Sequence, residues 1–305
     1  MVSDAGRRGP RIVAVINQKG GVGKTTSAVN LGAALSEAGQ RVLMIDLDPQ
    51  AHMSLHLGVD ATTIERSVYD ILVDESCAVS DTVIRVDDNL DAIAAETDLA
   101  AAESELADVA DRNEILRTRL DGILSRYDVV LIDCPPSLGL LTLNALAMAT
   151  EVFVPMQAHF LALQGVGKLL ETIGMVCSSV NPDLQVTGII LCMHERQTML
   201  AREVVSDLES FITSSRDQDV PWRACRVLQP PIRRNIKLAE APSFGQTIFQ
   251  YESDCHGARD YRKLAADVMA GWVTPTTTVQ AEEEPPCVVT PGETTGSDRD
   301  RVESA

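Results

Sequence analysis

The sequence predicts an α/β fold, in which helices flank an open β-sheet. Short apolar runs typical of buried strands alternate with segments that carry apolar residues at helical spacing. One of these runs leads into a glycine-rich loop, and two others end in aspartate. Open α/β sheets bind ligands at the carboxyl ends of their strands. The chain has 305 residues, 45% of them hydrophobic, which is long for one domain but sufficient for such a sheet.

The first predicted strand and helix enclose the glycine-rich loop. Residues 12–16 are apolar and mostly β-branched, as in a strand buried on both faces, and residues 27–38 carry an apolar helical stripe. The loop between them reads Gln-Lys-Gly-Gly-Val-Gly-Lys-Thr-Thr (18–26). Its glycines let backbone N–H groups converge, and the helix N-terminus adds partial positive charge. A plain glycine-rich turn does not account for Gly-Lys-Thr-Thr, so we interpret the loop as a nucleotide site.

Within the loop, the residue types match the parts of a Mg²⁺-nucleotide. Lys24 is expected to reach the β- and γ-phosphates of ATP, and the Thr25 hydroxyl to hold Mg²⁺. Lys19 is a second lysine at the start of the loop, and by itself it would be interpreted as a solvated surface residue. The other loop residues, Gly20, Gly21, Val22, Gly23, Lys24, Thr25 and Thr26, are predicted to bind the nucleotide.

Carboxylates follow two further predicted strands. Residues 41–45 lead into Asp46 and Asp48, which are two positions apart and therefore point to the same side. An ordinary Asp-Pro turn is the alternative for this segment. Residues 129–132 form an apolar run that is followed by Asp133, as in the strand that orients Mg²⁺-bound water in phosphoryl-transfer enzymes. We predict that these carboxylates face the phosphates and Mg²⁺.

The remaining elements are predicted from apolar periodicity. We expect helices over residues 68–73, 100–126 and 161–180 and from 197 onward, and strands over residues 90–94, 151–157 and 186–193. The seven cysteines are scattered without a CxxC pair, and their odd number argues against a disulfide framework. The sequence contains neither a run of about 18 apolar residues nor an apolar N-terminal signal segment. We therefore expect a cytoplasmic protein.

The most basic stretch covers residues 222–238 and holds five Lys and Arg residues with no acid. The net charge of −18 argues against DNA binding, because an acidic protein is repelled by DNA unless its positive charge is gathered on one face. Part of the acidity lies in residues 274–305, a Pro/Thr/Glu-rich tail with seven acids and two arginines. We predict a short tail over 1–10, one domain over 11–273, and a disordered acidic tail over 274–305.

Three motifs together resemble the ParA/MinD family of deviant Walker A ATPases, and most closely its ParA/Soj partition ATPases. They are Lys-Gly-Gly-Val-Gly-Lys-Thr-Thr (19–26), Asp-Leu-Asp-Pro-Gln (46–50) and Asp-Cys-Pro-Pro-Ser-Leu-Gly-Leu-Leu-Thr-Leu-Asn (133–144). The resemblance covers about residues 11–270. It implies a mostly parallel twisted sheet flanked by helices, with ATP and Mg²⁺ as cofactors.

The resemblance also implies roles for individual residues. Lys19 would reach across a homodimer to bind the partner's nucleotide. Lys19, Lys24 and Asp48 would act in hydrolysis, Asp48 by positioning the attacking water. Thr25, Asp46 and Asp133 would serve the metal, Asp46 from outside its direct ligands, and Asn235 would lie near the adenine. Cys134 is not expected to act as a nucleophile or to bind an iron–sulfur cluster.

In relatives, basic side chains of two segments bind the DNA backbone without reading sequence. The matching positions here are Arg196, Arg202, Arg234 and Lys237. The chain departs from the family pattern at Gln197, where relatives carry arginine, and at Ala51 and His52, where many carry Gly-Asn.

The function implied is an ATP-dependent partition switch. ATP would close a homodimer on nonspecific DNA, and a ParB-like partner would stimulate hydrolysis and release it, which implies a nucleoid-associated protein. We expect the short type of ParA, without a helix-turn-helix extension for operator binding. The alternatives are a MinD-like positioner that cycles on membranes, which needs a basic amphipathic C-terminal helix, a ParA-like positioner of a protein cargo, and a scaffold without hydrolysis. We expect no membrane partner.

Overall fold

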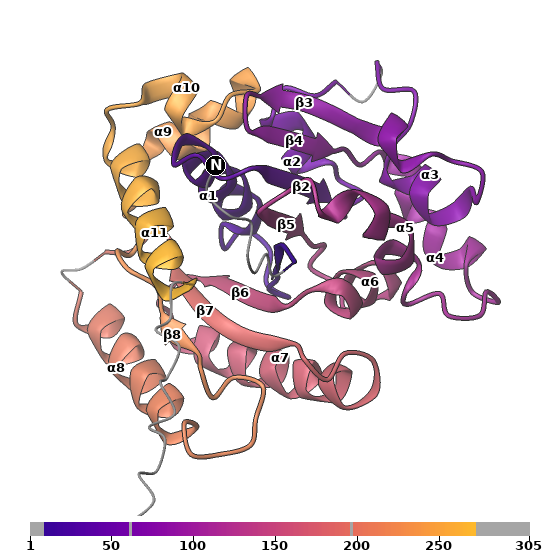
Figure 1. Ribbon diagram of the computed structural model, residues 1–305. Coiled ribbons are helices and arrows are strands. Elements are labelled where there is room, and N and C mark those ends of the chain that lie inside the picture. The colour runs from indigo at the N-terminus through magenta and orange to yellow at the C-terminus, as the bar shows by residue number, and fades with distance from the viewer. Residues whose placement is uncertain (1–8, 61–62, 196–197, 273–305) are drawn as a thin grey trace, which may run out of the picture. The chain divides into compact units, whose positions relative to one another are not determined.

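The computed structural model describes residues 9–60, 63–195 and 198–272 (Figure 1). The predicted acidic tail, and most of the predicted N-terminal tail, therefore lie outside the described residues. The strands are β1 (Arg11–Val15), β2 (Val42–Asp46), β3 (Val83–Asp87), β4 (Leu90–Ile93), β5 (Val129–Asp133), β6 (Glu151–Met156), β7 (Gln185–Leu191) and β8 (Arg226–Val227).

Helices connect these strands. The α-helices are α1 (Lys24–Glu37), α2 (His52–His56), α3 (Val68–Val73), α4 (Ala102–Glu105), α5 (Ile115–Leu124), α6 (Leu140–Met148), α7 (Phe160–Ser179), α8 (Met199–Ser214), α9 (Ile236–Glu240), α10 (Ile248–Glu252) and α11 (His256–Trp272). Three short 3-10 helices are η1 (Val79–Thr82), η2 (Thr97–Ala100) and η3 (Ala241–Phe244). None of the described helices is both long and apolar enough to cross a membrane.

The strands form one eight-stranded sheet in the order β3-β4-β2-β5-β1-β6-β7-β8. Only the edge pair β3–β4 is antiparallel among the described pairings, so the predicted mostly parallel sheet is confirmed. Within the sheet, β5 and β2 lie on one side of β1, and β6 lies on the other side of β1. Such a reversal of strand order leaves a crevice at the carboxyl end of β1, where ligands bind.

Two hydrophobic cores cover the two faces of the sheet (Figure 1). Alternate residues of β1 point into different cores: Ile12 and Ala14 belong to one, and Val13 and Val15 to the other. Helices α3, α5, α6, α7 and α8 supply the first core, while α1, α2, α9, α10 and α11 supply the second. A strand buried on both faces reads as an unbroken apolar run, which is why β1, β2 and β5 were predictable.

The predicted long helix over residues 100–126 is wrong. The segment instead contains the end of η2, then α4 and α5. Turns over residues 106–114 separate α4 from α5. Asp111 has a φ of +56°, a left-handed conformation that no α-helix contains, and Val109 is exposed rather than part of the apolar stripe. The start of α5 is fixed by Asn144 of α6, whose Oδ1 accepts a hydrogen bond from the Leu116 N–H at 3.0 Å. That partner comes from a different helix, so local periodicity did not reveal it.

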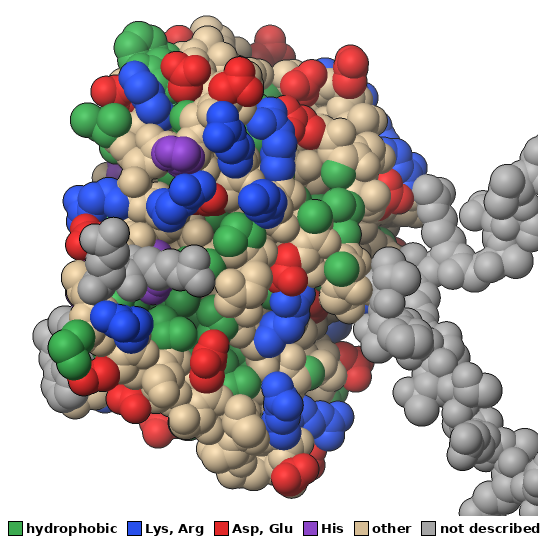
Figure 2. Space-filling model, turned by 90° about the vertical axis from the view of Figure 1, so that its left-hand side faces the viewer, with side chains coloured by type: hydrophobic (Ala, Val, Ile, Leu, Met, Phe, Trp, Pro, Cys, Tyr) green, Lys and Arg blue, Asp and Glu red, His purple; other side chains and the backbone are tan. Residues whose placement is uncertain are grey.

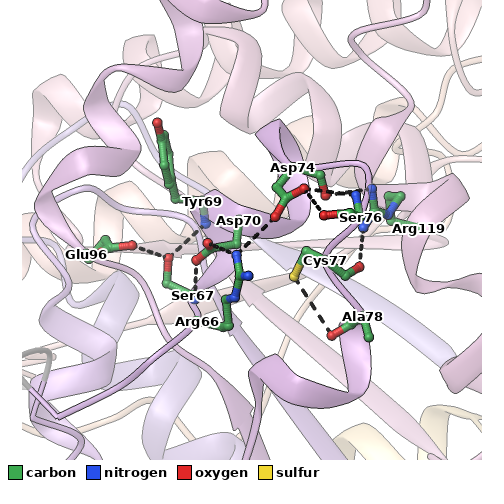
Figure 3. A network of polar contacts seen from close by, with 10 residues as sticks. All are labelled: Arg66, Ser67, Tyr69, Asp70, Asp74, Ser76, Cys77, Ala78, Glu96 and Arg119. Atoms are coloured by element: carbon green, nitrogen blue, oxygen red, sulfur yellow. Dashed lines mark hydrogen bonds and ion pairs between the residues drawn. The ribbon is translucent and has the colours of Figure 1, made fainter.

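A polar network holds the segment around α3 in place (Figure 3). Arg66 forms ion pairs with Asp70 at 2.8 Å and Asp74 at 3.0 Å, and Ser67 caps α3. From α5, Arg119 donates to the Asp74 carbonyl at 3.1 Å. The network joins α3 to α5.

Candidate nucleotide site

The glycine-rich loop follows β1 and takes a backbone conformation that requires glycine. Gly21 and Gly23 have φ values of +71° and +96°, in the region where a Cβ is strained. A Cβ at Gly23 would also lie 3.3 Å from Cys192. The Gly23 carbonyl accepts a hydrogen bond from the Ser27 N–H at 2.9 Å, which begins α1. Glycines in such conformations allow a loop to present its backbone N–H groups to a phosphate, as a phosphate cradle does.

A cavity of about 790 Å³ opens above this loop. That volume is typical of a site for a nucleotide-sized ligand. Among its lining residues are the predicted Gly20, Gly21, Gly23, Lys24, Thr25, Thr26, Asp48 and Asn235. Val22 is buried and Lys19 is exposed, and neither lines this cavity.

Three carboxylates gather at the adjacent ends of β2 and β5, where Asp46 pairs in register with Asp133. The Thr25 hydroxyl donates to Oδ2 of Asp133 at 2.7 Å. Asp46 accepts from the Asp48 N–H at 3.1 Å and from both the N–H and hydroxyl of Ser54, at 2.9 and 2.8 Å. The structure therefore brings together Thr25, Asp46 and Asp133 as predicted.

The electrostatics of this cluster suit a divalent cation. Burial raises the pKa of Asp46 to about 6, although hydrogen bonds from Ser54 and Asp48 oppose the shift. Burial, and then the neighbouring charge of Asp46, raises the pKa of Asp133 well above its ordinary value. In addition, Oδ1 of Asp133 is buried without a hydrogen-bond partner among the described residues. A cation at this position would satisfy that oxygen and offset the gathered negative charge.

Mg²⁺ fits this donor set better than other common ions. Its ligands are hard oxygens, and it usually keeps several waters and binds substrate phosphates instead of filling a cage of protein side chains. In the described parts of the chain, no group of three or more His, Cys, Asp or Glu side chains is placed to hold a metal ion.

The segment after β2 closes one side of the cavity. Asp48 is nearly buried, and its Oδ1 accepts a hydrogen bond from the Gln50 N–H at 3.0 Å. Ala51 follows with a φ of +51°, a left-handed conformation that is costly for alanine. A glycine would take this turn without strain, so Ala51 stores strain beside Asp48.

The wall of the cavity that residues 232–238 form was only partly predicted. Asn235 caps α9 with its side chain, which accepts from the Lys237 N–H at 2.9 Å. Sequence reasoning did not predict the apolar residues around it, Ile232, Ile236 and Leu238, or Cys192 and Tyr261 beneath the loop. These residues come from distant segments and carry no motif, so only the fold brings them together.

A second, larger cavity of about 1440 Å³ lies next to the first, and Arg233 and Arg234 line both. Its walls come from α8, the segment before α9, and α11. Of the predicted DNA-binding residues, Arg202 and Arg234 line it, whereas Lys237 does not. Lys263 of α11 also lines it and was not predicted. Arg196 and Gln197 lie outside the described residues.

Acids from other parts of the chain neutralise the basic stretch. Each of its five cations forms an ion pair: Arg223 with Asp219, Arg226 with Asp267, Arg233 with Asp260, Arg234 with Glu195, and Lys237 with Glu240. The side of the molecule that carries α8 and α11 accordingly shows basic side chains interspersed with acidic ones (Figure 2). Within the described chain, Arg202 and Lys263 are exposed cations without an ion-pair partner.

Known structures share this fold. A structure from Mycobacterium smegmatis described as cobyrinic acid a,c-diamide synthase, with bound ADP and magnesium, is 37% identical, with a TM-score of 0.71 over 86% of this chain and 95% of that one. A plasmid partition protein from Borrelia burgdorferi is 23% identical, with a TM-score of 0.64 over 87% and 100% of the two chains, which shows the fold alone.

Sequence comparisons show the family. Residues 10–186 match the family model described as AAA domain. The chain is 42% identical over 262 residues to the chromosome partitioning protein ParA of Caulobacter vibrioides, covering 85% of this chain and 94% of that protein. It is 41% identical over 260 residues to the sporulation initiation inhibitor protein Soj of Bacillus subtilis, covering 85% and 98%. Since these relatives are more than 40% identical over most of its length, the chain belongs to the ParA/Soj family of chromosome-partitioning ATPases.

Proposed function

We propose that the protein is a DNA partition ATPase that dimerises on ATP, binds nonspecific DNA, and is released when a ParB-like partner stimulates hydrolysis. The observation that carries the proposal is the convergence of Lys24, Thr25 and Asp48 on one cavity beside the buried Asp133. The predicted cofactors, ATP and Mg²⁺, agree with the related M. smegmatis structures, which hold ADP or an ATP analogue with magnesium.

The residues of the site divide the work of hydrolysis. Bound Mg²⁺ neutralises charge on the phosphates. Thr25, Asp133 and Asp46 would hold it, directly or through its waters. The Lys24 ammonium, nearly buried in the cavity, binds phosphate oxygens as charge develops on them. Asp48 also lines the cavity, and the bond from Gln50 fixes its carboxylate to orient the attacking water.

Lys19 supports the dimeric form of this mechanism. Its side chain is exposed and does not line the cavity of its own subunit, although the neighbouring Gly20 does. Its backbone N–H is held by the Asn17 side chain at 2.9 Å, which fixes the start of the loop. A lysine in this position is free to reach the nucleotide of a second subunit.

Arg202 and Arg234 support DNA binding, since both line the second cavity beside the nucleotide site. Arg202 is available at once, whereas Arg234 and Lys237 must exchange an acidic partner for a phosphate. Because Arg234 lines both cavities, it connects the two activities.

The test is binding to nonspecific duplex DNA with ATP, with ADP and without nucleotide, at two salt concentrations. We expect salt-sensitive binding that requires ATP and is lost in Lys19→Ala and Arg202→Ala. Arg216→Ala, which removes an exposed arginine of neither cavity, is the control. ATP binding without DNA binding would contradict the proposal. Binding to anionic vesicles in the same assay would favour a membrane positioner instead.

A further inference from the structure

A buried polar cluster beneath the nucleotide loop has no part in the function proposed above. It consists of Ser27 of α1, Cys192 after β7, and Tyr261 of α11. The Ser27 Oγ lies 3.3 Å from the Cys192 Sγ and 3.3 Å from the Tyr261 hydroxyl. Buried polar groups cost free energy unless they are paired. Ser27 pairs with both Tyr261 and Cys192, whose thiol also donates to the Ile190 carbonyl at 3.6 Å.

The cluster supports the loop at Gly23. A Cβ at Gly23 would lie 3.3 Å from the Cys192 Sγ and 4.0 Å from the Ser27 Oγ, so the cluster is in close contact with this turn. The Ser27 N–H also donates to the Gly23 carbonyl. Gly23 directly precedes Lys24, so a displacement of the turn would also move the residues that are expected to bind the phosphates.

At its other end the cluster belongs to α11, which also reaches the second cavity. Asp260, next to Tyr261, accepts from the N–H, Nε and Nη2 of Arg233 at 3.2, 2.9 and 2.6 Å. Arg233 lines both cavities. Adjacent residues of one helix thus contact Ser27 of α1, four residues after Gly23, and Arg233, which lines both cavities.

We propose that Tyr261 is a positioning residue of the nucleotide site: through Ser27 and Cys192 it holds the Gly23 turn and ties it to α11. Burial raises the pKa of Tyr261 well above its ordinary value, so the hydroxyl keeps its proton and can donate to Ser27. Through Asp260, the same helix then links the occupied loop to Arg233 and the second cavity.

The experiment compares Tyr261→Phe with Tyr127→Phe in the full chain. Each variant loses one hydroxyl from a buried ring. The Tyr127 hydroxyl donates to Asp91 at 2.8 Å. Tyr127 precedes the start of β5, whereas Asp133 is at the end of that strand. The dissociation constants for ADP and a nonhydrolysable ATP analogue are measured by calorimetry with Mg²⁺, and thermal unfolding confirms that both variants fold.

We expect Tyr261→Phe to weaken nucleotide binding about 3- to 10-fold, the effect of one lost hydrogen bond, and Tyr127→Phe to leave it unchanged. The effect of Tyr261→Phe should also be smaller in a Ser27→Ala background, since the two act as a unit. An unchanged constant in Tyr261→Phe, an equal change in both tyrosine variants, or full additivity with Ser27→Ala would overturn the proposal.

A second readout rests on the proposed function. The ratio of DNA affinities with and without ATP should fall in Tyr261→Phe at saturating nucleotide, and an unchanged ratio would overturn the link through α11. If the wild-type protein bound no DNA with ATP, the proposed function would fail, while the nucleotide titration would still decide the role of Tyr261.

Discussion

At the scale of single residues, the site is defined by charges that are buried before any ligand binds. Asp46 and Asp133 are completely buried side by side, and Lys24 is nearly so. Isolated buried carboxylates are expensive, and these have only partial compensation from Thr25 and Ser54. The nucleotide-free site therefore costs stability that the Mg²⁺-nucleotide restores on binding.

This cost predicts a pH dependence. A carboxyl group whose pKa is raised in the folded state stabilises the protein at pH values below its unfolded pKa, which is near 4. This stabilisation is lost as the pH rises through the pKa of the folded state. That pKa is about 6 for Asp46, and the pKa of Asp133 is also raised. Without nucleotide, Asp133→Asn should therefore lose less stability than wild type between pH 5 and pH 8. Thermal unfolding of both proteins at the two pH values measures this, and the comparison cancels the titration of other groups. Equal losses in the two proteins would contradict the account.

The ion pair between Arg234 and Glu195 predicts a gain of DNA affinity. Both side chains are more than half exposed, so the pair itself is weak, but it occupies a guanidinium that DNA phosphates need. Glu195→Gln should raise DNA affinity about two- to fivefold at low salt, as measured by fluorescence anisotropy. Glu209→Gln removes the same charge from the same cavity without freeing Arg234 and should have a smaller effect. Equal gains would show that the pair does not matter.

At the scale of elements, what the sequence predicted depends on where the stabilising contacts lie. Apart from Arg11, Asp46 and Asp133 at their ends, β1, β2 and β5 are apolar because both faces are buried. The aspartates that end β2 and β5 could therefore be placed from the sequence. The segment 100–126 was mispredicted because Asn144 and the turn at Asp111 define where α5 begins. The floor of the cavity was missed for the same reason, as Cys192 and Tyr261 reach it from distant segments.

The boundary of α5 gives a prediction of its own. The buried Asn144 side chain accepts from Leu116 and donates to the Arg112 carbonyl at 2.8 Å, so its loss leaves backbone groups unpaired. Asn144→Ala should lower the free energy of unfolding by about 2–3 kcal/mol, as measured by urea titration. The nucleotide dissociation constant should not change, because Asn144 is absent from the cavity wall. Unaltered stability would refute this explanation of the helix boundary.

At the scale of the whole molecule, charge is unevenly divided between the described domain and the C-terminal residues. Residues 274–305 carry a net charge of −5, so the chain without them has a net charge of −13 instead of −18. A less negative protein is repelled less by DNA, and salt screens the difference. Deletion of 274–305 should raise DNA affinity at low ionic strength and change it little at high ionic strength. A loss of affinity on deletion would contradict this prediction.

The placement of the site follows from the whole sheet, because the strand order reverses beside β1 and opens the crevice that the loop fills.

The central claim is that ATP in this crevice closes two subunits with Lys19 between them. The most direct test is the molecular mass in solution, by light scattering, with Mg²⁺ and either ADP or a nonhydrolysable ATP analogue. We predict a doubled mass only with the ATP analogue, and only in wild type, whereas Lys19→Ala should bind the nucleotide and stay monomeric. An unchanged mass in wild type, or a dimer formed equally well by Lys19→Ala, would contradict the account.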